Sequence, residues 1–137
     1  MTQTQKNLIL GLAFLVALSV MVYNVADDWG ELKADNETTI GLITHIGYNH
    51  AGSSGAAEYE YFVNGKRYVG QFARQKFCSS LLEQGKESIL GGEIVVVYVP
   101  SNPSNSMALL EQDDFEQFHT ELTDSMKNFL NRYFTCE

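Results

Sequence analysis

Basic residues are scarce in this sequence. Its 137 residues include nine Lys and Arg against 17 Asp and Glu, which gives a formal net charge of −8 at neutral pH. A surface with that charge repels phosphate backbones and anionic lipid headgroups. We therefore expect no nucleic acid among the partners of this chain.

The short motifs that carry common enzyme chemistry are also missing. No serine lies in a nucleophile-elbow motif, no glycine-rich phosphate loop precedes a predicted helix, and no C-x-x-C pair occurs. Glu58 and Glu60 lie on one side of a predicted strand, where pairing with Lys66 or Arg67 is their ordinary role. We expect no catalytic residues and no enzyme, with a thiol- or metal-dependent enzyme as the alternative from another class.

Metal-ligand spacing is absent as well. His45 and His50 are five positions apart, so on one regular strand they would face opposite sides. Glu116 and His119 form a single E-x-x-H, whereas di-iron bundles need two copies and further carboxylates on facing helices. We expect no metal site and no cofactor.

Only two cysteines are present, Cys78 and Cys136. If both lie outside the cytoplasm, they can form one disulfide that joins the C-terminal tail to the middle of the domain. In the chain-entropy model, closing such a loop contributes roughly 4 kcal/mol. Two unrelated thiols are the alternative.

A long apolar run lies near the N-terminus. From Leu8 to Tyr23 no residue is charged, and with Asn24 and Ala26 the run approaches the lower limit for crossing a bilayer, about 18 residues. A secretory signal peptide is the competing interpretation. Its best-placed cleavage site, Asn24-Val25-Ala26, has Asn where a small apolar residue is needed, so we favour an uncleaved anchor.

The flanks of the apolar run indicate its orientation. Lys6 and the terminal amine precede it, whereas acidic residues and only Lys33 among the bases follow closely. The positive-inside rule then favours a cytoplasmic N-terminus and a domain outside the cytoplasm. Tyr23 and Trp29 stand where interfacial aromatic residues often lie, at the outer end of the span.

After Thr38 the sequence alternates with period two. The pattern predicts a strand in which Ile40, Leu42, Ile46 and Tyr48 share one side. Such a half-apolar strand indicates a sheet with one face against a core.

Asn64 and Gly65 separate two further alternating runs, residues 58–63 and 67–72. Asn-Gly between alternating runs is the strongest short-range signal for a β-hairpin, because a type I′ turn needs positive φ at both central positions. We therefore expect a tight turn at Asn64-Gly65.

The apolar run 93–99 is typical of a strand buried on both faces. Pro100 and Pro103 are expected to end it, because proline cannot donate to a sheet ladder. Residues 107–110 are predicted to form a short final strand, and 75–86 a short helix or loop.

The last segment, 113–134, is predicted to be one amphipathic helix. Asp113 can cap it, with Glu116 completing a capping-box-like arrangement. The helix is expected to pack on its own sheet; binding a partner or a membrane surface are the alternatives. Its apolar stripe has three- and four-residue spacings and comprises Phe115, Phe118, Leu122, Met126, Phe129, Leu130 and Tyr133.

Three motifs in this order resemble a family of bacterial membrane-associated proteins known as domain of unknown function thirty-five ninety-two. They are Gly41-Leu42-Ile43, the stretch 59–68 (YEYFVNGKRY) and the stretch 92–103 (GEIVVVYVPSNP). The resemblance spans about residues 41–110. It implies a small β-barrel-like or curved-sheet domain attached to a membrane helix, and it brings no known activity. The C-terminal helix and the two cysteines depart from the family's pattern.

These inferences predict an α+β protein with two parts. An N-terminal transmembrane anchor and short stalk occupy residues 1–33. An extracytoplasmic domain occupies 34–137, with a mainly antiparallel curved or barrel-like sheet of about five strands packed by the C-terminal helix. The expected location is the bacterial inner membrane, as a single-pass protein with its domain periplasmic or extracellular.

The expected function is that of a non-catalytic protein-binding module or accessory subunit of a membrane complex. The partner would be another envelope or membrane protein with a basic surface, since opposite charges favour encounter. An immunity-type protein that neutralises a toxin at the membrane is the alternative.

Overall fold

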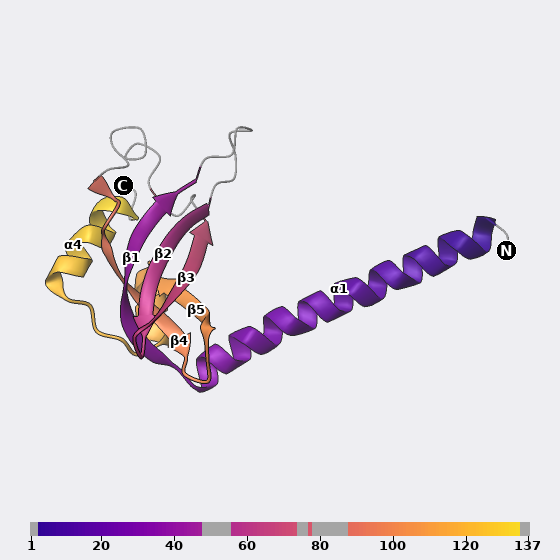
Figure 1. Ribbon diagram of the computed structural model, residues 1–137, viewed down its shortest axis with the longest axis horizontal. Coiled ribbons are helices and arrows are strands. Elements are labelled where there is room, and N and C mark those ends of the chain that lie inside the picture. Colours follow the sequence, from indigo (N-terminus) through magenta and orange to yellow (C-terminus); the bar gives the residue numbers. More distant parts are fainter. Residues whose placement is uncertain (1–2, 48–55, 74–76, 78–87, 135–137) are drawn as a thin grey trace.

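The computed structural model of this chain describes residues 3–47, 56–73, 77 and 88–134 (Figure 1). A long helix leads into a curved sheet, and two short helices follow the last strand. The elements are α1 (Gln3–Ala34), β1 (Glu37–Ile46), β2 (Ala56–Val63), β3 (Lys66–Ala73), β4 (Glu93–Val99), β5 (Asn102–Leu109), α3 (Gln112–Gln117) and α4 (Asp124–Tyr133).

The five strands form one antiparallel sheet in the order β3-β2-β1-β4-β5. The sheet curls until β5 comes close to β3, so that it is nearly closed. Two tyrosines of β2 cross the interior to β5. The Tyr59 hydroxyl lies 3.3 Å from Oγ of Ser106, and the Tyr61 hydroxyl donates to the carbonyl of Pro103. The predicted α+β fold with a five-stranded, barrel-like sheet is confirmed.

Gly70 makes room for the ring of Tyr59. Gly70 of β3 lies opposite Tyr59, and a Cβ built on it would lie 2.2 Å from Cζ of the Tyr59 ring. The ring also stacks on Phe72 with centroids 6.1 Å apart. Tyr59 can therefore lie flat across β3 only because residue 70 has no side chain.

The strand β1 differs from its sequence prediction. Ile40 and Leu42 point outward, with 47% and 44% of their surfaces exposed, whereas Ile43 and Ile46 are buried. A register shift between Ile43 and His45 explains the change, because one extra residue reverses the alternation beyond it. The prediction that Ile40, Leu42 and Ile46 share one side is therefore wrong, and Tyr48 lies outside the described residues.

The strand β4 is buried on both faces, as its continuous apolar sequence predicts. All residues from Ile94 to Val99 are buried. Successive side chains of a strand point to opposite faces, so two separate layers must cover them. Tyr98 lies on the interior side, 6.5 Å from the ring of Tyr61. On the other side α1 and α4 lie against the strand.

Asn64 and Gly65 form the turn between β2 and β3. Val63 pairs with Lys66, and the φ angles of the two turn residues are 51° and 78°. Positive φ at both positions is the geometry of a type I′ turn. Pro103 departs from its expected role: β4 ends at Val99, but Pro103 lies inside β5, which is longer than the predicted strand 107–110. Apart from Phe77, the segment 75–86 lies outside the described residues.

The predicted helix 113–134 is two helices, α3 and α4, so that prediction is wrong. His119 adopts a φ of 50° after α3, which ends the helix. Thr123 then starts α4, because its hydroxyl accepts a hydrogen bond from the Met126 amide at 3.3 Å. The first cap also lies elsewhere than predicted: Glu111 and Asp114 form the capping box, in place of Asp113 and Glu116.

We expect Gly70→Ala to destabilise the domain by about 1–3 kcal/mol, because the new methyl group would displace the Tyr59 ring. Gly30→Ala is the matched control: no atom lies near its Cβ position, and alanine favours the helix by roughly 0.5–1 kcal/mol. Urea unfolding of both variants in mild detergent measures the difference. Equal stabilities would show that the tyrosine does not occupy this space.

A loss of stability at high pH is also expected. Burial raises the pKa of Tyr59 from 10.0 to about 12 and raises that of Tyr61, and a hydrogen bond to Glu37 raises the pKa of Tyr98. The unfolded chain loses these protons at lower pH than the folded one. The contribution of these tyrosines to the free energy of unfolding should therefore be constant below about pH 10 and fall above it, by roughly 1.4 kcal/mol per pH unit for Tyr59.

Urea unfolding at pH 9 and pH 11 tests this expectation. In Tyr59→Phe the fall between the two pH values should be smaller, since phenylalanine has no proton to lose. Parallel losses in the two proteins would show that the Tyr59 hydroxyl ionises equally in both states.

Candidate functional site

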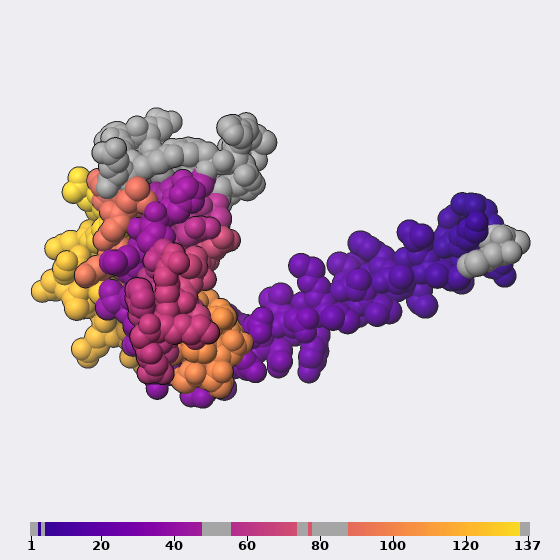
Figure 2. Space-filling view, in the orientation of Figure 1, coloured from indigo at the N-terminus to yellow at the C-terminus, as the bar shows by residue number. Residues whose placement is uncertain are grey.

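The helix α1 is long and apolar enough to cross a membrane. Its segment Gln5–Ala34 has 30 residues and a mean hydropathy of 2.4 over its most apolar stretch, none of which is buried inside the protein. Figure 2 shows most of the helix standing clear of the domain. The apolar side chains of this stretch are therefore not part of the domain's core, and a bilayer would cover them.

The C-terminal turns of α1 belong to the domain. Leu32 is only 2% exposed and lies within the core cluster. Trp29 meets Phe118 edge-on, with ring centroids 6.2 Å apart and planes at 87°. Lys33 covers the Trp29 ring, its Nζ lying 4.9 Å from the centroid. The sequence predicts Trp29 at a membrane interface; in the structure its ring contacts Phe118 of the domain.

A hydrogen bond from Asn105 also joins α1 to the domain. We call this contact, together with those of Trp29 and Leu32, the junction. The side-chain amide of Asn105 donates to the carbonyl of Asp28 at 2.8 Å. Asn105 lies in β5, so this bond connects the C-terminal end of α1 to an edge strand of the sheet. No sequence pattern indicated Asn105, because the two residues are far apart in the chain and join only when the fold is complete.

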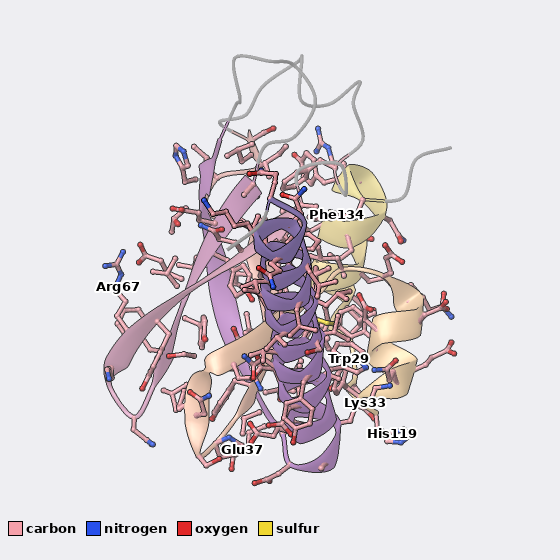
Figure 3. The ribbon with its side chains drawn as sticks, turned by 90° about the vertical axis from the view of Figure 1, so that its right-hand side faces the viewer. Trp29, Lys33, Glu37, Arg67, His119 and Phe134 are labelled. Carbon is pink, nitrogen blue, oxygen red and sulfur yellow. The ribbon has the colours of Figure 1, made fainter. Side chains whose placement is uncertain are left out.

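An open groove of about 1010 Å³ lies between α3 and α4. Its floor is apolar, and Leu110, Phe115 and Leu130 form part of it. His119 and Phe134 both line the groove; in Figure 3 His119 lies near Trp29 and Lys33, and Phe134 lies farther along the same side of the domain. Because Phe118, next to His119, contacts Trp29, the groove lies close to the C-terminal end of α1.

Charged side chains line the rim of the groove. Four are carboxylates, from Glu111, Glu116, Glu121 and Asp124, and one is the ammonium group of Lys127. These four carboxylates and one ammonium group give a balance of −3. The Gln112 amide donates to Glu116 at 3.1 Å, and Glu111 takes part in the capping box of α3. An apolar floor with an acidic rim suits a ligand that is both apolar and cationic.

The remaining sequence candidates lie in other places. Glu60 pairs with Arg67, and the guanidinium group holds the pKa of Glu60 below its ordinary value. Glu58 accepts a hydrogen bond from Gln71 at 3.0 Å. Glu60 thus has the cross-strand role expected of it, whereas Glu58 has Gln71 as its partner in place of the expected Lys66 or Arg67. Glu116 and His119, the two ends of the E-x-x-H motif, both line the groove.

The other candidates concern metal and disulfide chemistry. Within residues 3–47, 56–73, 77 and 88–134, no group of three or more His, Cys, Asp or Glu side chains is arranged to hold a metal ion. His50, Cys78 and Cys136 lie outside the described residues, so the disulfide stays a prediction.

Comparison with family models, with curated proteins and with solved structures gave no match. The resemblance of the stretch 41–110 to a bacterial membrane-associated family therefore remains an expectation from the sequence.

We expect Trp29→Ala to loosen the junction, because an aromatic pair contributes about 0.5–1.5 kcal/mol beyond its buried area. Hydrogen exchange of the amides in residues 28–34 should then accelerate by roughly two- to tenfold in mild detergent. Tyr23→Ala, in the exposed part of α1, is the control and should leave these amides unchanged. Unchanged exchange in Trp29→Ala would mean that the aromatic contact does not hold the junction.

Proposed function

We propose that this chain is a non-catalytic protein-binding module anchored in the bacterial inner membrane, where it serves as an accessory subunit of a membrane complex. The observation that carries this proposal is the junction between α1 and the domain. Leu32, Trp29 and Asn105 fix the end of the membrane helix to the sheet and to α3. A binding groove is thereby held at one place and one angle beside the bilayer.

An uncleaved anchor is part of the proposal. The candidate cleavage site Asn24-Val25-Ala26 lies inside the unbroken helix α1, where every backbone group takes part in helical hydrogen bonding. The helix continues to Ala34 and enters the core through Leu32. These features support a permanent anchor over a signal peptide, whose cleavage site follows its apolar core.

The proposed orientation places the domain in the periplasm or outside the cell. Lys6 precedes the span, and acidic residues follow it directly. The strong negative charge of the domain supports a basic partner surface, since opposite potentials accelerate encounter and select among partners.

Affinity purification of the full-length chain from its native host, in mild detergent, tests the proposal. The expected result is a stoichiometric membrane protein that co-purifies with a chain of uncleaved mass. Recovery with a soluble basic protein would instead support the immunity-type role. Recovery of the chain alone, or of a product cut after Ala26, would overturn the accessory-subunit proposal.

The cysteines test the orientation in the same preparation. Outside the cytoplasm, Cys78 and Cys136 should resist alkylation until a reductant is added, because oxidising compartments preserve disulfides. Mass spectrometry after alkylation under non-reducing conditions reads this directly. Two alkylated cysteines would contradict the bridge, and labelling of a tag on the N-terminus from outside the cell would contradict the orientation.

A further inference from the structure

The groove between α3 and α4 combines an apolar floor with an acidic rim. Its floor is made of side chains that continue the core, among them Leu110, Phe115 and Leu130. Its rim carries four carboxylates against one ammonium group. An apolar floor contributes affinity through burial, whereas the rim selects the sign of the ligand's charge.

The position of the groove limits where its ligand can come from. Phe118 ends α3 and contacts Trp29, and the next residue, His119, lines the groove. Trp29 follows Ala26 by three residues, or about 4.5 Å of helix, so the groove opens close to the outer end of the apolar run. A segment that leaves the membrane beside α1 would reach it directly.

We infer that this groove binds a short cationic segment of a membrane-embedded partner, with Lys or Arg side chains on the acidic rim and a large apolar side chain on the floor. The inference rests on the proposed function and adds the site and the chemistry of recognition. Glu116 and Glu121 are the carboxylates best suited to a test. Both are exposed and line the groove, and neither forms the capping box of α3.

The experiment uses the full-length chain in nanodiscs of neutral phosphatidylcholine, so that lipid charge does not attract the probe. The probe is an eight-residue peptide in which pairs of arginine or lysine alternate with leucine. A peptide of the same pattern with glutamate in place of the basic residues is the ligand control. Empty nanodiscs measure binding to lipid alone.

Matched variants locate the binding. Each exposed ion pair contributes a factor of about 1.4 to 5 in affinity, so Glu116→Gln with Glu121→Gln should weaken binding roughly 2- to 25-fold. Glu58→Gln with Glu93→Gln removes the same charge from the sheet and should change affinity less than twofold. Lys127→Gln removes the positive charge of the groove and should strengthen binding by up to about fivefold.

The outcomes distinguish failure of the groove as the binding site from failure of the accessory-subunit role. Equal losses in the two double variants, or equal binding of the anionic peptide, would overturn the groove as the site. Weaker binding in Lys127→Gln would overturn the cationic ligand. If a membrane partner co-purifies equally with wild type and the groove variant, the accessory role stands and this inference fails. If the peptide binds the groove but no membrane partner is recovered, the inference on ligand chemistry stands and the accessory role fails.

Discussion

Two tyrosines hold the sheet closed. Tyr59 and Tyr61 extend from β2 across the interior and end at Ser106 and Pro103 of β5, at the opposite edge of the sheet. The strands β3 and β5 remain the two edges of the sheet, and the tyrosine contacts hold these edges close together without a backbone ladder between them. Each aromatic ring fills the interior while its hydroxyl finds a polar partner, which is the condition for burying a tyrosine without a large penalty. Gly70 makes this arrangement possible, because the Tyr59 ring occupies the space that a side chain at position 70 would need.

The nearly closed sheet also explains how the C-terminal end of α1 becomes part of the domain. With its inner face covered by tyrosine rings, β4 still presents an apolar outer face, and α1 and α4 both lie against that strand. Leu32 therefore continues a core that begins inside the barrel. Removing α1 would expose apolar surface on the sheet, so the C-terminal end of α1 is packed as part of the domain.

Local signals in the sequence predicted local structure well. The turn at Asn64-Gly65 needs only its own two residues, and β4 needs only its own apolar run, so each lies where its pattern indicates. The face of β1 depends on a bulge between Ile43 and His45, which the alternation alone does not show. The break after α3 depends on the positive φ of His119, an unusual conformation for a residue other than glycine.

The junction and the groove could not be predicted for a related reason. Asp28 and Asn105 meet because the sheet brings β5 to the end of α1, and no short pattern encodes that meeting. The acidic residues of the last segment were visible in the sequence as the polar face of one helix. Only the break into α3 and α4 arranges Glu116, Glu121 and Asp124 around an apolar floor. The candidate site thus depends on the break after α3, which the prediction of one continuous helix missed.

Charge and burial have separate roles at such a site. Each exposed ion pair contributes only about 0.2–1 kcal/mol of free energy. Salt at about 0.1 M largely screens exposed charges that are more than about 10 Å apart. The acidic rim alone would therefore hold a partner weakly, although it would steer a basic one toward the groove. In the proposed anchored form, the same charge would repel anionic headgroups and oppose contact between the domain and the bilayer. Because Trp29 and Asn105 join the domain to α1, this repulsion would favour an orientation in which the proposed groove stays open beside the membrane. Burial of an apolar side chain on the floor then supplies the affinity that the charges cannot.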